Sequence, residues 1–543
     1  MRRDRNRNLF ALFLVVILLG GGVLALQGVT VERADFTFNN SSEPESLDPK
    51  VVSGVPEGRV LRCLYEGLTN MHPQTLAPVP GMAERWEISE DGRTYTFHIR
   101  KNARWSNGEP LTAKDFEYSW RRFLGPDVPG KYAQLLWLVK KGKAYMEKKA
   151  SWSEVGIRAP DAYTFVVELV HPTAYFLDLC SFYPLFPVRR ETVEAHPKTW
   201  YKPENFVGNG PFILAGRMIR DRIRLKKNPH YWDADSVRLN TVDILPVEDM
   251  VTGLNLYLTG VVDWQPDVPQ QVMRDLEKRD DFQNRAYLGS YFYRINLKNR
   301  NPEKARFLSD RRFRRALYLA MDRKAIVEGV TKAGERPARS LVPPGIKGYR
   351  SPELPGTDLA QARALVEEVK KDLGVTEVPA LTILYNTSES HKSIAEVIQQ
   401  QWGRGLGLKI KLENQEWGTY LNSQKTLDYD ICRSAWIGDY ADPNTFLDLF
   451  VTGGGNNNTG YADKDYDALI DAAARELDKG KRLAILHKAE EKLLRDLPMI
   501  PIYYYVTKNL VRPWVKGFYP NIQNVHPLKY VWIDEKAKRA FDG

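Results

Sequence analysis

The stretch A-L-T-I-L-Y-N, residues 380–386, decides the fold class, because comparable apolar runs return twice after helix-length gaps. L-K-I-K-L-E-N follows at 408–414 and Y-D-I-C-R-S-A-W at 429–436, and both are short and rich in aliphatic or aromatic residues, as strands are. Between the first two runs, we predict a helix from His391 to about Arg404. Strands that alternate with helices indicate an α/β layer with crossover connections.

A different arrangement precedes this layer. T-Y-T-F-H-I-R (94–100) alternates polar and apolar residues at period two, which predicts a strand with one buried face. Thr112 and Asp115 have the spacing of a capping box, and the apolar residues after them recur on one face of a helix. Further strands are predicted at 163–170 and 222–228. The chain therefore combines a strand-rich N-terminal part with an alternating C-terminal part.

Length and charge limit the class of protein. A chain of 543 residues exceeds what one hydrophobic core usually supports, so two or three domains are expected. Residues 1–26 hold four Arg and one Asp, which leaves +7 of the formal charge of +10 on the rest. That excess is spread along the chain without a basic block, which argues against a nucleic-acid-binding protein. Three cysteines exclude a disulfide framework, although one bridge remains open.

The N-terminus carries a targeting segment. M-R-R-D-R-N-R-N is basic, and the 18 residues from Leu9 to Leu26 contain no charge, which is typical of a secretion signal. Its length lies at the border between a cleaved signal and a spanning anchor, and the small-residue site near Val23 and Ala25 is weak. We therefore expect export across a membrane, with either cleavage or an uncleaved anchor. No cysteine follows the run, so a lipid-modified N-terminus is not indicated.

The sequence gives little sign of catalysis. G-G-G-N-N-N (453–458) lacks the Gly-Lys-Ser/Thr ending of a phosphate-binding loop and predicts a surface loop. His487, Glu490 and Glu491 are neighbours on a predicted helix, but without a second His they offer a metal only a partial shell. Nucleophile-elbow, C-x-x-C and H-E-x-x-H motifs are missing. We therefore predict a protein that is not an enzyme, with no metal site and no cofactor.

One carboxylate in S-A-W-I-G-D-Y-A-D-P-N-T-F-L-D-L-F (434–450) has no evident structural role. Asp442 precedes Pro443, and Asp at the N-cap with Pro at the first position is a favoured way to open a helix. Asp439 lies three residues earlier, at the carboxyl end of a predicted strand, where ligands bind in α/β layers. A dry, unpaired carboxylate costs several kcal/mol. Asp439 must therefore meet water, an internal cation or a cationic group of a ligand.

This segment and several others resemble the oligopeptide-binding, extracytoplasmic subunits of ABC transporters, the OppA-like class of solute-binding protein family 5. The resemblance runs from about Asn39 to about Trp532. The further motifs that carry it are N-x-x-E-P-x-S-L-D-P (40–49), S-G-V-P-E (53–57), Y-E-G-L (65–68), W-S-N-G-E-P-L-T-A-K-D-F-E-Y-S-W (105–120), R-R-F-R-R-A-L-Y-L-A-M-D-R (311–323), L-Y-N-T-S-E-S-H-K (384–392), N-Q-E-W (414–417) and P-I-Y-Y-Y-V (501–506).

The resemblance implies an α/β fold, namely the two-lobed, three-domain clamp of periplasmic binding proteins of type II, cluster C. Hinge segments are expected around 287–293 and 503–507. The implied divisions are a signal peptide or anchor at 1–26, a discontinuous domain I at 27–65, 189–288 and 506–543, an inserted domain II at 66–188, and domain III at 289–505.

The resemblance also implies a peptide site. Asp439 matches the aspartate that pairs with the peptide's α-ammonium, and the peptide backbone is expected to lie extended against main chain on both sides. Arg433 and His391 match positions that meet the ligand's carboxylate. Gln424 and Thr331 replace family cations but have Lys425 and Lys332 beside them, so the preferred peptide length stays open. The remaining implied contacts are Ser53, Gly54, Val55, Tyr132, Ala435, Trp436, Ile437 and Tyr504, and Ser53 stands where the family also has an acidic residue.

The implied function is a monomeric periplasmic receptor that captures short peptides and delivers them to an ABC permease in the inner membrane. Two alternative functions are compatible with the same fold, namely a murein-tripeptide recycling protein and an anchored peptide sensor. A peptide hydrolase of the envelope would share the substrate but needs a nucleophile or metal that the sequence does not reveal.

Overall fold

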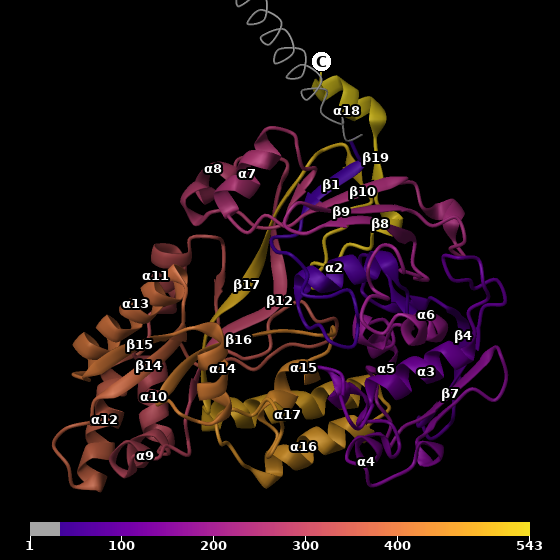
Figure 1. Cartoon of the computed structure of the whole chain (residues 1–543). Helices are drawn as coiled ribbons and strands as arrows, with labels where there is room; N and C mark the ends of the chain where they lie inside the picture. Colours follow the sequence, from indigo (N-terminus) through magenta and orange to yellow (C-terminus); the bar gives the residue numbers. More distant parts are fainter. Residues whose placement is uncertain (1–32, 543) are drawn as a thin grey trace, which may run out of the picture. The chain divides into compact units, whose positions relative to one another are not determined.

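The largest sheet of the structure is mixed and has eleven strands, which come from parts of the sequence between Phe36 and Val511 (Figure 1). The computed structural model describes residues 33–542, so the predicted signal peptide or anchor at 1–26 lies outside the described residues. The chain divides after Asp35, and Phe36–Gly543 forms one compact unit. In spatial order the sheet contains β15 (Ile410–Gln415), β14 (Leu381–Asn386), β16 (Ile431–Ile437), β12 (Phe282–Ile295), β17 (Met499–Val511), β11 (Trp264–Gln265), β1 (Phe36–Asn39), β10 (Thr241–Leu245), β9 (Arg222–Lys227) and β8 (Phe212–Met218), and β13 (Arg336–Pro337) pairs with β17.

The predicted α/β layer is present at one end of this sheet. β14 pairs in parallel with both β15 and β16, and the connections run through α13 (Glu389–Leu406) and α14 (Trp417–Lys425). Ser388 caps the start of α13 by accepting from the His391 N–H, and Gly407 ends the helix at φ 68°. The crossover connections expected from the alternating pattern are therefore confirmed.

The strand-rich part forms a separate four-stranded sheet. Its order is β4 (Ala83–Ile88), β5 (Thr94–Ile99), β7 (Thr164–Glu168) and β6 (Ile157–Arg158). Alternate residues of β5 are buried, as the period of two predicts. The predicted capping box of Thr112 and Asp115 opens α3 (Ala113–Phe123). The Trp120 ring of α3 packs edge-on against Phe165 of β7 at 5.2 Å.

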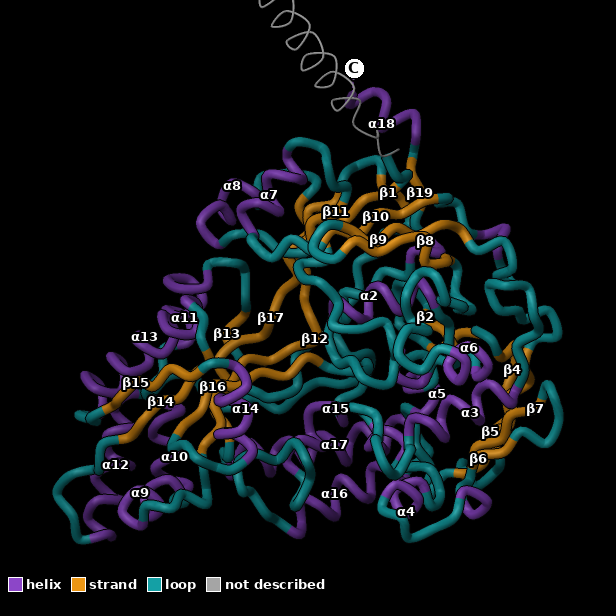
Figure 2. Tube along the Cα trace, in the orientation of Figure 1, coloured by secondary structure: helices purple, strands orange, loops and turns teal. Residues whose placement is uncertain are grey.

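Other helices cover the sheets, and Figure 2 shows α9–α13 gathered near the β14 and β15 end. Among the described residues, no helix is both long and apolar enough to cross a membrane. Two short strand pairs complete the fold: β2 (Thr69–Met71) with β3 (Pro78–Pro80), and β18 (Val515–Lys516) with β19 (Trp532–Ile533). The remaining α-helices are α2 (Val55–Leu64), α4 (Gly142–Met146), α5 (Phe176–Leu179), α6 (Arg190–Ala195), α7 (Met250–Leu258), α8 (Met273–Leu276), α9 (Pro302–Leu308), α10 (Arg311–Leu319), α11 (Arg323–Ile326), α12 (Leu359–Leu373), α15 (Asn444–Leu447), α16 (Lys464–Arg475), α17 (Lys479–Asp496) and α18 (Glu535–Asp542).

Two large hydrophobic cores fill the unit. The first is built mainly from β1, β5, β7–β10, α2 and α3, and the second from β12, β14, β16, α10, α13 and α17. Cys63, Cys180 and Cys432 are buried and free, so the bridge left open by the sequence is not formed. Two cores in one chain are the physical basis of a two-lobed α/β clamp.

The long strands β12 and β17 connect the two cores. They pair antiparallel on both sides of a register shift, where Tyr287, Leu288 and Gly289 stand opposite Tyr505 alone. Such bulges bend a strand and interrupt its ladder. The irregularity lies within the segments expected to act as hinges, while the domain boundaries themselves remain predictions.

Candidate functional site

A cavity of about 460 Å³ lies between segments that belong to the two cores. The start of α2 and the loop before it form one wall, and the end of β16 forms another. The cavity brings together residues separated by almost 400 positions in sequence. The predicted contacts that line it are Ser53, Gly54, Val55, Tyr132, Ala435, Trp436, Ile437 and Asp439.

Asp439 lines this cavity but, among the described residues, pairs with neither of the arginines of the lining, Arg59 and Arg62. Burial raises the pKa of its carboxyl to about 7, and burial and then the charge of Asp439 raise the pKa of the neighbouring Asp448 to about 7. Within the described part of the chain, no ion pair includes this carboxylate. Its backbone is fixed, because its N–H donates to Thr445 Oγ1 at 3.2 Å and its carbonyl accepts from Gln523 Nε2 at 3.1 Å. Of the three partners considered from the sequence, water or a ligand cation remain.

Gly438 explains how β16 delivers this carboxylate. Its N–H donates to the carbonyl of Leu288 at 2.8 Å, which docks the end of β16 onto the bulge of β12. A Cβ at position 438 would lie 2.6 Å from Leu288 Cδ2, closer than carbon atoms approach in proteins. The glycine therefore permits the close contact that holds Asp439 at the cavity.

Asp442 differs from its predicted role. It was expected to be the N-cap, with Pro443 as the first helical residue, but α15 begins at Asn444 and Pro443 occupies the cap position. Asp442 Oδ1 accepts from the Asn444 N–H at 2.9 Å, so it still satisfies a donor at the helix start. Its main partner is Arg482 of α17, which donates to both carboxylate oxygens at 2.6 and 2.9 Å. The bidentate pair holds the carboxylate one residue outside the cap position.

Tyr132 lines the cavity beside the α2 wall. Its hydroxyl donates to the Ser53 carbonyl at 3.4 Å, and its ring packs edge-on against Phe182 at 5.4 Å. Burial and then the charge of Asp439 raise the pKa of Tyr132 well above its usual range, so its hydroxyl stays protonated near the carboxylate.

One open strand edge borders the cavity, at the end of β16. β16 pairs with β14 only at Ile431 and Cys432, so no strand covers that edge beside Ala435–Ile437. Opposite, Val55 is 49% exposed at the start of α2. An open strand edge accepts an extended peptide by main-chain hydrogen bonds, and such bonds do not depend on the peptide's side chains.

Arg433 and His391 lie outside the lining of this cavity, and both contact Tyr291. Arg433 donates to Asn386 Oδ1 and to the Tyr505 hydroxyl, both at 3.3 Å, and lies 4.9 Å from the centre of the Tyr291 ring. His391 Nδ1 lies 3.3 Å from the Tyr291 hydroxyl. Burial and then the charge of Arg433 lower the pKa of His391 to about 3, so His391 is neutral at physiological pH. Arg433 therefore holds the positive charge of this pair.

Tyr504 faces away from the cavity. Its hydroxyl accepts from the Ser340 N–H at 3.2 Å, and residue 504 pairs with Arg336 of β13. Side chains alternate across a strand, so Tyr505, next in β17, points to the Arg433 side. Of the two neighbours, Tyr505 has the better position for a site near Arg433.

The structure also adds residues to the cavity that the sequence did not identify. The lining includes Arg59, Arg62, Trp264 and His526, from α2, β11 and the C-terminal segment. The sequence could have indicated only that Val55, Arg59 and Arg62 share one helix face, because they occupy positions i, i+4 and i+7. That spacing alone does not reveal which face is turned toward a ligand.

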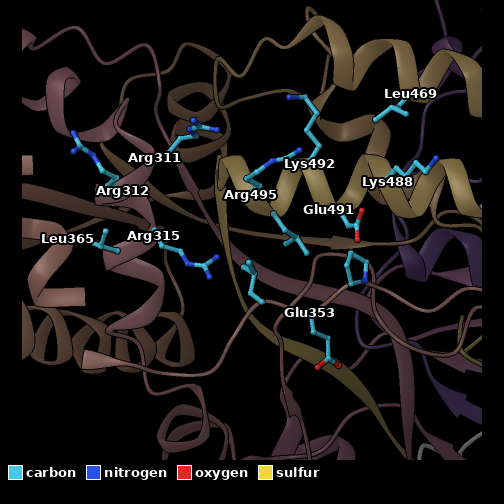
Figure 3. Close-up of a pocket in the computed structure, with 13 residues that line it drawn as sticks. Arg311, Arg312, Arg315, Glu353, Leu365, Leu469, Lys488, Glu491, Lys492 and Arg495 are labelled. Carbon is cyan, nitrogen blue, oxygen red and sulfur yellow. The ribbon is translucent and has the colours of Figure 1, made fainter. Parts of the chain in front are cut away.

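Figure 3 shows a second hollow, of about 970 Å³, where α10 faces α16 and α17. Carboxylates match several of its cations, as in the pairs Arg312–Glu368 at 2.7 Å and Lys492–Asp463 at 2.8 Å. The predicted peptide contacts are not among its lining residues, so it is a solvated, charged surface and a weaker candidate. The lining consists of Arg311, Arg312, Arg315, Pro352, Glu353, Leu354, Leu365, Leu469, Lys488, Glu491, Lys492, Leu494 and Arg495.

Comparisons with known proteins bear on the sequence and the fold of the chain. Residues 77–458 match the model of the middle region of bacterial extracellular solute-binding proteins, family 5. The chain is 37% identical to the dipeptide-binding protein DppE of Bacillus subtilis, over 92% of this chain and 91% of that protein. Two solved structures superpose with TM-scores of 0.80 and 33% identity. The murein tripeptide-binding protein MppA of Escherichia coli matches over 93% of this chain and 99% of its own, and Haemophilus influenzae OppA in complex with RPPGFSPFR over 92% and 99%.

Proposed function

Because the chain belongs to family 5 of the bacterial extracellular solute-binding proteins, we propose that it captures short peptides between its two lobes and delivers them to an ABC permease. The family consists of binding proteins that work outside the cytoplasm, and DppE and OppA carry peptide binding in their names. We further propose that the protein is a periplasmic monomer without catalytic activity. In this proposal the segment 1–26 directs its export, and the protein stays anchored to the membrane if that segment is not cleaved.

The observation that carries the proposal is Asp439, an enclosed carboxylate that forms no ion pair among the described residues and whose pKa no cation lowers. A peptide's α-ammonium supplies the missing positive charge. Charge-assisted hydrogen bonds of this kind are worth roughly 1.5–3 kcal/mol. The main chain at Ser53–Val55 and Ala435–Ile437 would pair with the peptide backbone, and hydrated space around the ligand's side chains would make the binding tolerant of sequence.

In this proposal, closure of the two lobes around the peptide produces the form of the protein that delivers it to the permease. With no ligand, bringing the lobes together leaves Asp439 enclosed and unpaired, which costs free energy. A bound ammonium removes that cost, so ligand favours the closed clamp over the open one. In this scheme β12 and β17 bend near 287–289 and Tyr505, and Arg433 meets the carboxylate of longer peptides.

The first test uses Asp439→Asn, which keeps the size of the side chain but removes its charge. Affinity for a free-amine tripeptide is expected to fall roughly 10- to 100-fold, since about 1.4 kcal/mol corresponds to tenfold. The N-acetylated tripeptide, which lacks the ammonium, is expected to bind wild type and variant alike. Isothermal titration calorimetry measures both affinities.

Asp428→Asn is the matched control, because Asp428 is exposed and lies away from the cavity lining. It should leave both affinities unchanged. Equal losses for free and acetylated peptide in Asp439→Asn would contradict the assigned role. Chromatography of the peptide after incubation separates binding from hydrolysis, since a receptor returns the tripeptide intact.

A second candidate is a murein-peptide receptor, favoured by the superposition on MppA at a TM-score of 0.80. A murein tripeptide included in the same titrations separates the two functions. Tighter binding of that ligand than of ordinary tripeptides would favour the second.

A further inference from the structure

Arg59 is an arginine of the cavity wall for which the structure offers no anionic partner. Its Nη1 has one hydrogen bond, to the Asn40 carbonyl at 3.5 Å, and its buried Nε has none. Among residues 33–542 no ion pair includes Arg59. The guanidinium carbon lies 5.1 Å from the centre of the Trp264 ring, which also lines the cavity.

Arg59 is held in position by α2. The residues of this helix that line the cavity recur with the spacing of one helix face: Val55, Gly58, Arg59, Arg62 and Cys63. Arg59 lies four residues beyond Val55, about 6 Å along the helix axis at ~1.5 Å per residue. That is about two residues of an extended peptide at ~3.3 Å each. A peptide that pairs with Ser53–Val55 therefore passes within reach of Arg59.

The other groups around Arg59 do not neutralise it. Burial lowers the pKa of Arg59 to about 10, a decrease that Tyr287 and Asp267 only partly oppose, so the guanidinium is still charged at neutral pH. His526 in the same wall is neutral, because burial and then Arg59 lower its pKa to about 3. Arg62 adds a second cation, with Nη1 bonded to the Ser181 carbonyl at 2.9 Å. The cavity thus carries negative charge at Asp439 and positive charge on the α2 wall.

We propose that Arg59 forms a carboxylate-binding subsite of the peptide cavity, so that the protein prefers peptides presenting a carboxylate to α2. This inference rests on the proposed function. Arginine presents a planar, bidentate donor set to a carboxylate, and the site is already desolvated. The carboxylate comes either from an acidic side chain of the peptide or from its C-terminus, and both sources present the same group.

Three peptide pairs distinguish the sources. Ala-Glu-Ala against Ala-Gln-Ala, and Ala-Ala-Glu against Ala-Ala-Gln, change only the side chain. Tri-alanine against its C-terminal amide changes only the terminus. Wild type is expected to bind the carboxylate member of at least one pair about 10-fold more tightly or better.

Arg59→Gln is expected to abolish that preference and leave the affinity for the uncharged member within about 2-fold of wild type. Arg59→Lys keeps the charge without the bidentate fork and should retain part of the preference. Arg315→Gln, on the distant charged surface of Figure 3, removes an equal charge and should bind every peptide as wild type does. The midpoint of thermal unfolding of unliganded Arg59→Gln should equal or exceed that of wild type, because an uncompensated charge is removed.

The outcomes separate this inference from the proposed function. A preference that persists in Arg59→Gln, or a wild type that shows none, overturns the subsite even when Asp439→Asn behaves as expected. Failure of wild type to bind any of these peptides overturns both proposals.

Discussion

At the scale of single residues, the role proposed for Asp439 depends on the cost of enclosing its charge. The enclosing protein raises its pKa to about 7, which measures how poorly the empty cavity supports the charge. A ligand ammonium restores the interaction that water would have provided. The free energy lost by enclosing the carboxylate is therefore recovered only when a cationic amino end is present.

The raised pKa predicts a pH dependence of binding. As pH falls through 7 an increasing share of Asp439 in the empty cavity is protonated, and the neutral carboxyl cannot pair with an ammonium. Affinity for free-amine peptides should thus fall by up to about 10-fold per pH unit below 7, and it should also fall above about pH 8, where the peptide's own α-amino group loses its proton. Titration calorimetry between pH 5 and 8 measures this slope.

The slope should be absent for N-acetylated peptides and for Asp439→Asn. A slope that survives in the variant would assign the titration to another group. Proton release on binding at pH 6, detected by comparing buffers of different ionisation enthalpy, is the companion observation expected for wild type.

Residues of the site were predictable from sequence to different degrees. Asp439 was identifiable because a carboxylate between apolar residues and a capped helix lacks a local partner. Arg59 was not, because an arginine on a helix is ordinary until the fold shows that its face meets a cavity in which, among the described residues, it forms no ion pair. Tyr504 was predicted as a peptide contact, whereas its neighbour Tyr505 points to the Arg433 side. Successive side chains of a strand point to opposite faces, so an error of one residue selects the wrong face.

At the scale of elements, the junction of β16 and α15 depends on one ion pair. Arg482 on α17 has a side chain only 3% exposed, and that of Asp442 is 17% exposed. Removing one partner of a buried pair leaves the other charge uncompensated. This pair therefore supports the segment that carries Asp439, although it lies outside the cavity lining.

Asp442→Ala is predicted to lower the free energy of unfolding by about 3–5 kcal/mol, because Arg482 is left buried without its carboxylate. Urea denaturation measures the change. Glu194→Ala is the control, since it breaks the exposed pair Arg190–Glu194 of α6, with exposures of 60% and 54%, and should leave the free energy of unfolding nearly unchanged. Similar losses for the two variants would show that the Asp442 pair is no stronger than a surface pair.

Elements were largely predictable, and their ends less so. The strand at 94–99 and the capping box of α3 follow from local spacing, which depends only on near neighbours. The start of α15 was displaced by one residue because Arg482, forty positions away, holds Asp442. Long-range contacts of this kind leave no local pattern in the sequence.

At the scale of the whole unit from Phe36, the segment that follows β16 of the second core packs into the first core through an aromatic contact. Tyr440 follows Asp439, yet its buried ring belongs to the first core. It stacks on Tyr175, which precedes α5, with ring centres 4.4 Å apart and planes 10° apart. No periodicity of either segment predicts this contact, because it exists only when the two cores approach each other.

The stack predicts that a residue outside the cavity controls affinity. In Tyr175→Ala the closed clamp loses an aromatic pair worth about 0.5–1.5 kcal/mol beyond its buried area, while the cavity lining is unchanged. Free-amine and N-acetylated tripeptides should both bind at least about 2- to 10-fold more weakly, chiefly through faster dissociation in stopped-flow measurements. Tyr175→Phe keeps the stack and should bind nearly as wild type, and so should Tyr145→Ala, which breaks an aromatic pair within one lobe. Wild-type dissociation rates in Tyr175→Ala would mean that this contact does not contribute to closure.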